Sequence, residues 1–107
     1  MFFGWYSDER KPELIDNTAY AYPPCNMDKG GQVYFNMDEF WTDDFLKKFA
    51  LHEIGHAIGL KSHSLNSKDI MQKSPDKTKG VLSSNDVKRA VSLYGRERNY
   101  DNETGLA

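Results

Sequence analysis

Several residue types and patterns are scarce in this chain, and each scarcity excludes something. A single cysteine, Cys25, leaves no partner for an internal disulfide. No apolar stretch approaches the length that a membrane-spanning helix needs. The 14 basic and 16 acidic residues give a formal net charge of −2. Because nucleic acids and anionic membranes attract strongly basic surfaces, neither is a favoured partner, and nothing in the composition indicates an oligomeric state.

The length of the chain limits the number of domains. At 107 residues there is room for one. We expect this domain to span residues 1–95, because residues 96–107 are polar and without periodicity, as in a disordered tail. Residues 1–9 lack the basic start and long apolar run of a signal peptide, so they do not predict secretion.

Histidine is also scarce, and its distribution is the main functional signal. All three histidines lie between residues 52 and 63. Residues 42–59 are predicted to form one helix, with Thr42 as N-cap, two aspartates in the first turn and Gly59 at the end. His52 and His56 are four positions apart, so they share a helix face and can present ring nitrogens to one point.

Glu53 lies beside this pair, and residues 52–56 read His-Glu-x-x-His. In zinc hydrolases the two imidazoles of this motif hold the metal, and the glutamate takes a proton from the water on it. The alternative is that His52 and His56 are ordinary surface histidines and Glu53 is a solvated carboxylate. The apolar character of the remaining helix argues against this alternative, because buried imidazoles need partners and a metal supplies them.

The residues after the helix extend the pattern. Gly59 can adopt the left-handed conformation that turns the chain back, which makes His63 the natural third ligand. Met71 follows at a distance suited to a methionine turn beneath the site. With these residues the chain resembles the metzincins, and most closely the matrixins, the matrix metalloproteinase family. The family pattern is His-Glu-x-x-His-x-x-Gly-x-x-His followed by a Met-turn.

The resemblance covers most of the chain, from about Phe2 to Gly95, and implies a fold. Besides the motif, it is carried by residues 18–24, 30–42 and 82–95. It implies an α+β, zincin-like fold with a small mixed β-sheet above the active-site helix and a C-terminal helix below. The sequence of that last helix predicts Ser84 as N-cap, Gly95 as C-cap and an apolar stripe under the site. The stripe consists of Val87, Ala90, Val91 and Tyr94.

The resemblance also implies an activity. It makes the chain a zinc-dependent endopeptidase acting on extended peptide or protein substrates. One catalytic zinc is then held by His52, His56 and His63, Glu53 is the general base, and Met71 forms the Met-turn without binding the metal. If the chain is a fragment that behaves as the family does, its location is extracellular.

Substrate binding is implied by a further segment. Residues 18–22 alternate in character and end at two prolines, as an edge strand does. In the family this edge pairs with the substrate through main-chain hydrogen bonds. The resemblance therefore assigns the backbone of Ala19, Ala21 and Tyr22 to substrate binding. Cys25 follows in a loop, where an ordinary thiol is favoured over a zinc-binding thiolate.

One departure from the family concerns the third ligand. Three residues separate Gly59 from His63, where the family has two. One residue of extended chain is worth roughly 3.3 Å, which a bulge in the turn can absorb. We expect His63 to bind zinc nonetheless, and Asp69 is the best substitute if it falls short.

Two further departures concern structural metals and the start of the fold. Tyr20 and Tyr34 stand where the family supplies histidines to a structural zinc, so we expect no structural zinc. Asn36 stands where a calcium-binding aspartate is usual, although Glu39 remains, so calcium is expected weakly if at all. The family's first two strands and first helix are missing, which makes the chain a minimal version of the fold or a fragment.

Two other classes of function stay open. The departures are compatible with a catalytically inactive relic that binds peptides at its edge strand. They are also compatible with a structural fragment whose apolar helix is buried against a partner chain.

Overall fold

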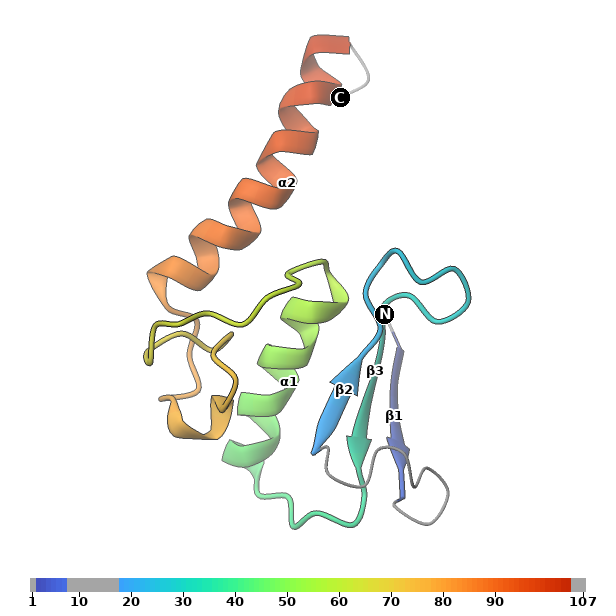
Figure 1. Ribbon diagram of the computed structural model, residues 1–107, viewed down its shortest axis with the longest axis vertical. Coiled ribbons are helices and arrows are strands. Elements are labelled where there is room, and N and C mark those ends of the chain that lie inside the picture. Colours follow the sequence, from blue (N-terminus) through green and yellow to red (C-terminus); the bar gives the residue numbers. More distant parts are fainter. Residues whose placement is uncertain (1, 8–17, 105–107) are drawn as a thin grey trace.

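Along the chain, the strands of the fold come first and the helices follow. The computed structural model describes residues 2–7 and 18–104. Within them lie a three-stranded sheet, a central helix α1, a short 3₁₀ helix η2 and a C-terminal helix α2 (Figure 1). Their bounds are β1 Phe2–Tyr6, β2 Ala19–Ala21, β3 Gln32–Asn36, α1 Asp43–Ala57, η2 Pro75–Lys77 and α2 Ser84–Thr104. The predicted α+β fold is confirmed.

The sheet is mixed, as predicted. Its strand order is β1-β3-β2, with β1 parallel and β2 antiparallel to β3. Side chains on a strand alternate between the two faces. Val33 and Phe35 on β3 therefore point into the core, with 0% and 5% of their surface exposed. Tyr34 points to the other face, where its ring stacks on that of Tyr20 with centroids 5.2 Å apart.

Helix α1 begins and ends as its sequence predicts. The Thr42 side chain accepts a hydrogen bond from the backbone N–H of Phe45, and two aspartates occupy the first turn. After the C-cap residue Ile58, the chain reverses at Gly59, whose φ is +121°. Only glycine adopts such a backbone conformation without strain. The reversal brings the following loop back alongside the helix (Figure 1).

Two apolar clusters hold α1 in place. The first joins Val33 and Phe35 of the sheet to Ala57, with Trp41, Leu46 and Phe49 packed around them. The second lies on the opposite side of α1 and consists of Leu60, Ile70 and Met71, with Leu51 and Leu93 against it. Helix α1 is thus packed between the sheet and the segment that follows it, which fixes the faces that its side chains present.

The start of α2 differs from the prediction. Ser83 rather than Ser84 caps the helix: its Oγ accepts the N–H of Asp86 at 3.0 Å, and Asp86 Oδ2 accepts the N–H of Ser83 at 2.9 Å. This reciprocal pair is a capping box, Ser-x-x-Asp here. A capping box satisfies two free N–H groups at once, whereas the side chain of Ser84 as a lone N-cap would satisfy only one.

The end and the apolar stripe of α2 differ as well. The helix continues through Gly95, the predicted C-cap, to Thr104. Glycine inside a helix costs about 1 kcal/mol relative to alanine, and the arginines and glutamate that follow it are good helix formers. Val87, Ala90 and Val91 of the predicted stripe line an apolar pocket of about 240 Å³ beside α1. The side chains of Val87, Val91 and Tyr94 nevertheless stay 45–56% exposed. Residues 105–107, the rest of the predicted tail, lie outside the described residues.

Among the described residues, no helix combines the length and apolar character needed to cross a membrane.

Candidate metal centre

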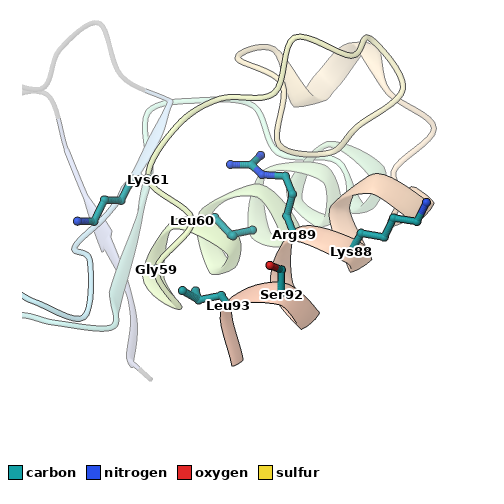
Figure 2. A pocket seen from close by; sticks show the side chains of 7 residues that line it. All are labelled: Gly59, Leu60, Lys61, Lys88, Arg89, Ser92 and Leu93. Atoms are coloured by element: carbon teal, nitrogen blue, oxygen red, sulfur yellow. The ribbon is translucent and has the colours of Figure 1, made fainter. Parts of the chain in front are cut away.

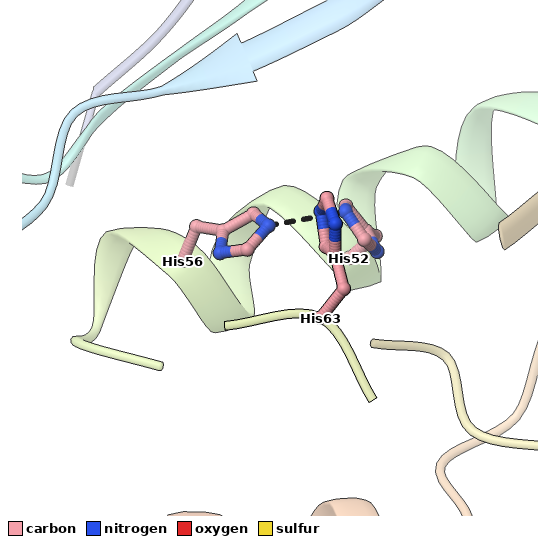
Figure 3. A group of neighbouring side chains, drawn as sticks. All are labelled: His52, His56 and His63. Atoms are coloured by element: carbon pink, nitrogen blue, oxygen red, sulfur yellow. Dashed lines mark hydrogen bonds between the residues drawn. The ribbon is translucent and has the colours of Figure 1, made fainter. Parts of the chain in front are cut away.

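The three histidines of the chain meet at one point. His52 and His56 project from α1, and His63 reaches them from the loop that follows Gly59 (Figure 3). One ring nitrogen of each lies within 4.8 Å of the other two. In the part of the chain that the structure describes, this is the one cluster of three or more histidine, cysteine or acidic side chains that could hold a metal ion. The late His63 therefore joins the pair predicted from the helix.

Hydrogen bonds fix the orientation of two of the rings. His52 Nδ1 lies 2.8 Å from the carbonyl oxygen of Ile70, and His56 Nδ1 lies 2.7 Å from that of Leu60. A carbonyl oxygen only accepts, so both Nδ1 atoms must carry the proton. In the neutral rings, both Nε2 atoms then offer a lone pair. A backbone carbonyl on the second nitrogen is the usual arrangement around a metal-binding histidine.

The two lone pairs face each other. His52 Nε2 and His56 Nε2 are 3.2 Å apart, marked by the dashed line in Figure 3. Two nitrogens at about 2.0–2.1 Å from a tetrahedral zinc are roughly 3.3 Å apart, so the observed spacing fits one metal between them. Without a proton or a cation between them, the two lone pairs would repel each other. The donor set therefore suits a zinc ion.

The surroundings keep these rings neutral. Burial, together with the neighbouring His56 and His63 rings, lowers the pKa of His52 to about 4, although the hydrogen bond to the Ile70 carbonyl acts in the opposite direction. Burial also lowers the pKa of His56, with contributions from His63 and from Arg89. Both imidazoles are thus unprotonated at Nε2 near pH 7, which is the form that binds a metal.

Glu53 is buried beside the histidine pair. Only 6% of its surface is exposed, and burial raises the pKa of its carboxyl from 4.5 to about 7. A carboxyl with this pKa can both accept and return a proton near neutrality, which is what a general base requires. Glu53 lies outside the histidine cluster, and its role as the base beside the two ligands stays a prediction.

Met71 packs directly under the same turn of α1. Its side chain is 1% exposed and lies so close to Gly55 that a Cβ atom there would overlap the sulfur. Gly55 stands between His52 and His56 in the sequence, so its missing side chain lets the methionine approach the helix at the level of the histidines. The segment that supplies Met71 also supplies the Ile70 carbonyl that orients His52.

Asp69, the substitute ligand, has a different position. It is fully buried and accepts hydrogen bonds from Ser64 Oγ at 2.5 Å, Ser83 Oγ at 2.6 Å and Asn85 Nδ2 at 2.5 Å. Burial raises the pKa of this carboxyl, but the hydrogen bonds outweigh burial and hold it below its ordinary value. Asp69 therefore connects the loop after His63 to α2 and does not join the histidine cluster.

Sequence reasoning missed Asp86 and Arg89. Asp86 accepts the backbone N–H groups of Ile70 at 2.8 Å and Met71 at 3.3 Å. Arg89 donates from Nη2 to the carbonyl oxygen of Ser62 at 2.9 Å. The Ser-x-x-Asp spacing of a capping box was visible and could have pointed to Asp86. No local pattern announces the Arg89 contact, because its partner is 27 residues away.

Comparison with known proteins identifies the family. The family model for matrixins matches residues 6–95 of the chain. The chain belongs to the matrixin family.

Three relatives illustrate the extent of the matrixin likeness. Stromelysin-1 of Rattus norvegicus is 40% identical over 85 residues, which is 72% of this chain and 18% of the relative. Matrix metalloproteinase-27 of Tupaia belangeri is 40% identical over 84 residues, or 72% of this chain and 16% of the relative. Interstitial collagenase of Bos taurus is 35% identical over 88 residues, or 78% and 18%. This matrixin chain thus spans less than a fifth of the length of these relatives.

The edge strand of this matrixin corrects one predicted contact. Tyr22 donates its N–H to Gln32 at 3.0 Å and accepts the N–H of Gly31 at 3.0 Å, so its backbone is engaged beside β3. Because backbone groups alternate in direction along an antiparallel strand, those of Ala19 and Ala21 point to the free edge. The assignment of Tyr22 to substrate binding is therefore wrong, and that of Ala19 and Ala21 stays a prediction.

The residues at the family's structural metal positions make other contacts in this matrixin. Tyr20 and Tyr34 belong to a cluster of aromatic rings on the outer face of the sheet, and burial raises the pKa of Tyr20. Asn36 Oδ1 accepts the N–H of Asp38 at 2.9 Å. Cys25 is a free, exposed thiol outside the histidine cluster.

Proposed function

We propose that this chain is the catalytic part of a zinc-dependent endopeptidase. The observation that carries the proposal is the pair of facing Nε2 atoms, 3.2 Å apart, with His63 completing a set of three donors. Catalytic zinc sites use three protein ligands and keep one position for water. Membership of a family of zinc metalloendopeptidases supports peptide bonds in proteins as the substrate. The same membership supports an extracellular location.

The chemistry divides between the metal and the chain. His52, His56 and His63 would hold the zinc ion, whose charge would lower the pKa of a bound water to about 7 and polarise a substrate carbonyl. The Glu53 carboxylate takes the proton from the attacking water and returns it to the nitrogen of the leaving amine. Its burial excludes bulk water from the carboxylate and raises its pKa to about 7, close to that of a zinc-bound water.

The edge of the sheet would orient the substrate. Strand β2 is an edge strand and packs on α1, so an extended peptide paired with it would run past the helix that bears the histidines. The outward N–H and carbonyl groups of Ala19 and Ala21 are available to such a peptide. Main-chain pairing positions a peptide bond without demanding a particular side chain.

The decisive test compares peptide cleavage by the parent and by Glu53→Gln, with Asp76→Asn as the matched control. Asp76 is exposed in η2, so neutralising its carboxylate should leave the rate unchanged. Loss of a general base lowers the rate by about 10²–10⁴-fold. Zinc content should stay the same in all three proteins, and a chelator should abolish cleavage until zinc is restored.

The same comparison separates the endopeptidase from an inactive peptide-binding module. Such a module would bind an extended peptide, with or without zinc. The parent and Glu53→Gln would then show the same absence of cleavage. Equal behaviour of the two proteins would therefore refute the hydrolytic function and favour the module.

A further inference from the structure

His63 differs from the other two histidines in what holds it. Its ring is exposed, and within residues 2–7 and 18–104 it makes no hydrogen bond. The rings of His52 and His56 are fixed by carbonyl oxygens and by the helix that bears them. The His63 ring nevertheless lies with its centroid 5.2 Å and 5.1 Å from theirs. Its position must therefore be set by the backbone on either side.

On the N-terminal side, that backbone is bound by Arg89. The guanidinium Nη2 donates to the Ser62 carbonyl oxygen at 2.9 Å and lies 3.4 Å from the Ser62 Oγ. Figure 2 shows Arg89 rising from α2 toward the loop, over a hollow of about 500 Å³ lined by Leu60 and Leu93 among others. The other terminal nitrogen, Nη1, is buried without a partner among the described residues. Part of the Arg89 guanidinium is thus removed from water where the side chain binds Ser62. Surface arginines usually keep these nitrogens hydrated.

On the C-terminal side, the backbone is bound by Asp69 and the Met71 segment. Ser64 donates its N–H to the Met71 carbonyl at 2.8 Å and its Oγ to Asp69 Oδ2 at 2.5 Å. Asp69 in turn is anchored to the start of α2 through Ser83 and Asn85. Both neighbours of His63 are therefore bound by side chains connected to α2. Ser62 is bound by Arg89, which lies on α2, and Ser64 by Asp69, which is hydrogen-bonded to the start of α2.

This arrangement compensates for the added residue between Gly59 and His63. A longer loop has more conformations, so it delivers a ligand to one point less often unless it is tied down. We propose that Arg89 and Asp69 are positioning residues that fix Ser62 and Ser64 and so place His63 as the third metal ligand. The inference rests on the proposed zinc centre, but not on peptide cleavage.

The test is a double-mutant cycle on zinc affinity, measured by competition with a chromophoric chelator on the full chain. Arg89→Ala should weaken zinc binding about 10–100-fold, as is usual when the support of a metal ligand is removed. In a His63→Ala background the same substitution should change affinity less than about twofold, because the ligand through which it acts is gone. Lys88→Ala is the matched control: Figure 2 shows this neighbouring cation pointing away from the loop, so affinity should not change.

A second variant tests the other flank. Ser64→Ala removes the hydroxyl that Asp69 binds without leaving a buried charge unpaired, and should follow the same cycle as Arg89→Ala. The visible spectrum of the cobalt-substituted protein is an independent readout, because losing one of three nitrogen ligands changes its bands. Arg89→Ala and Ser64→Ala should shift the spectrum toward that of His63→Ala.

Three results would overturn the inference. The first is an unchanged affinity in both Arg89→Ala and Ser64→Ala. The second is an equal loss with and without His63, which would mean that these residues act on folding in general. The third is a His63→Ala protein with parental affinity, since His63 would then not be a ligand. A parent that binds zinc and obeys the cycle but cleaves no peptide would refute only the proposed hydrolysis and leave the positioning role in place.

Discussion

Asp86 and His52 are connected through a single residue, Ile70. The Ile70 N–H donates to Asp86 Oδ2 at 2.8 Å, and the Ile70 carbonyl accepts from His52 Nδ1 at 2.8 Å. Asp86 is 3% exposed and also binds the N–H of Met71. A buried carboxylate on α2 thus fixes the peptide segment that selects the tautomer and ring orientation of a candidate zinc ligand.

Replacing Asp86 should therefore affect both stability and metal binding. In Asp86→Asn the amide can present only one oxygen to backbone N–H groups, and its NH₂ would face a donor. We expect the free energy of unfolding to fall by about 1–3 kcal/mol, as for a buried donor left unpaired. Zinc affinity should fall about 10–100-fold through the loosened His52. Chemical denaturation and chelator competition measure the two effects.

Asp76→Asn is the matched control for this substitution. Asp76 is exposed in η2, and its side chain has no bond to the Ile70–Met71 segment, so neither quantity should change. If Asp86→Asn kept parental zinc affinity while losing stability, Asp86 would support the fold but not the orientation of His52.

The contrast between Glu53 and Asp86 explains how far the sequence alone reaches. The histidine pair, Glu53 and the caps of α1 follow from spacing on one helix, so local periodicity predicts them. Asp86 acts across 16 residues and Arg89 across 27, and neither contact leaves a periodic signal. Such long-range hydrogen bonds depend on how the segments pack, which a single sequence does not reveal.

The corrected contact of Tyr22 has the same origin. The sequence indicates the strand, but which backbone groups face outward depends on the register with β3. For Asp69, the sequence predicts only the role of a substitute ligand should His63 fall short, because a carboxylate near a metal motif suits that role. In the structure, Ser64, Ser83 and Asn85 surround it, and they come from segments that the sequence keeps apart.

The raised pKa of Glu53 makes a prediction for the metal-free protein. Its carboxyl titrates at about 7 when folded, against 4.5 as the ordinary value, so the folded state holds the proton more tightly. The stability that protonation contributes is fully present below about pH 4.5 and is lost as the pH rises through about 7. At about 1.4 kcal/mol per pKa unit, the change is on the order of 3 kcal/mol.

The variant Glu53→Gln isolates this contribution. His52, whose pKa is lowered to about 4, has the opposite effect, because its neutral folded form loses stability as the pH falls below about 6.5. Both proteins contain His52, so the difference between their free energies of unfolding reports on Glu53 alone. After zinc removal, Glu53→Gln should gain stability relative to the parent between about pH 5 and 8. A difference independent of pH would contradict a raised pKa.

The close approach of Met71 to Gly55 predicts that Gly55→Ala lowers the free energy of unfolding when Met71 is present and raises it when Met71 is replaced by alanine. In Gly55→Ala, the new Cβ would overlap the Met71 sulfur and stand 2.9 Å from its Cε. Overpacking costs typically 1–3 kcal/mol, whereas alanine in place of glycine gains about 1 kcal/mol of helix propensity. Because Met71 is 1% exposed, its side chain can move only within a packed core, and we expect a net loss of up to about 2 kcal/mol by chemical denaturation.

Removing the methionine side chain provides the control. In a Met71→Ala background there is no sulfur to overlap, so Gly55→Ala should become stabilising by up to about 1 kcal/mol. A loss of the same size in both backgrounds would show that the cost of Gly55→Ala arises elsewhere in α1.

The aromatic face of the sheet leads to a prediction about metal stoichiometry. Tyr20 and Tyr34 are stacked with their centroids 5.2 Å apart, and burial raises the pKa of Tyr20, so its phenol stays protonated at neutral pH. A protonated phenol is a poor zinc ligand, because zinc sites in proteins use thiolate, imidazole and carboxylate. We expect one zinc per chain by elemental analysis of the purified protein. The double variant Tyr20→Phe/Tyr34→Phe should keep that value, since only hydroxyl groups are removed. A second zinc in the parent that disappears in this variant would prove that the tyrosines bind metal, whereas a zinc lost only in His52→Ala would place the single ion among the histidines.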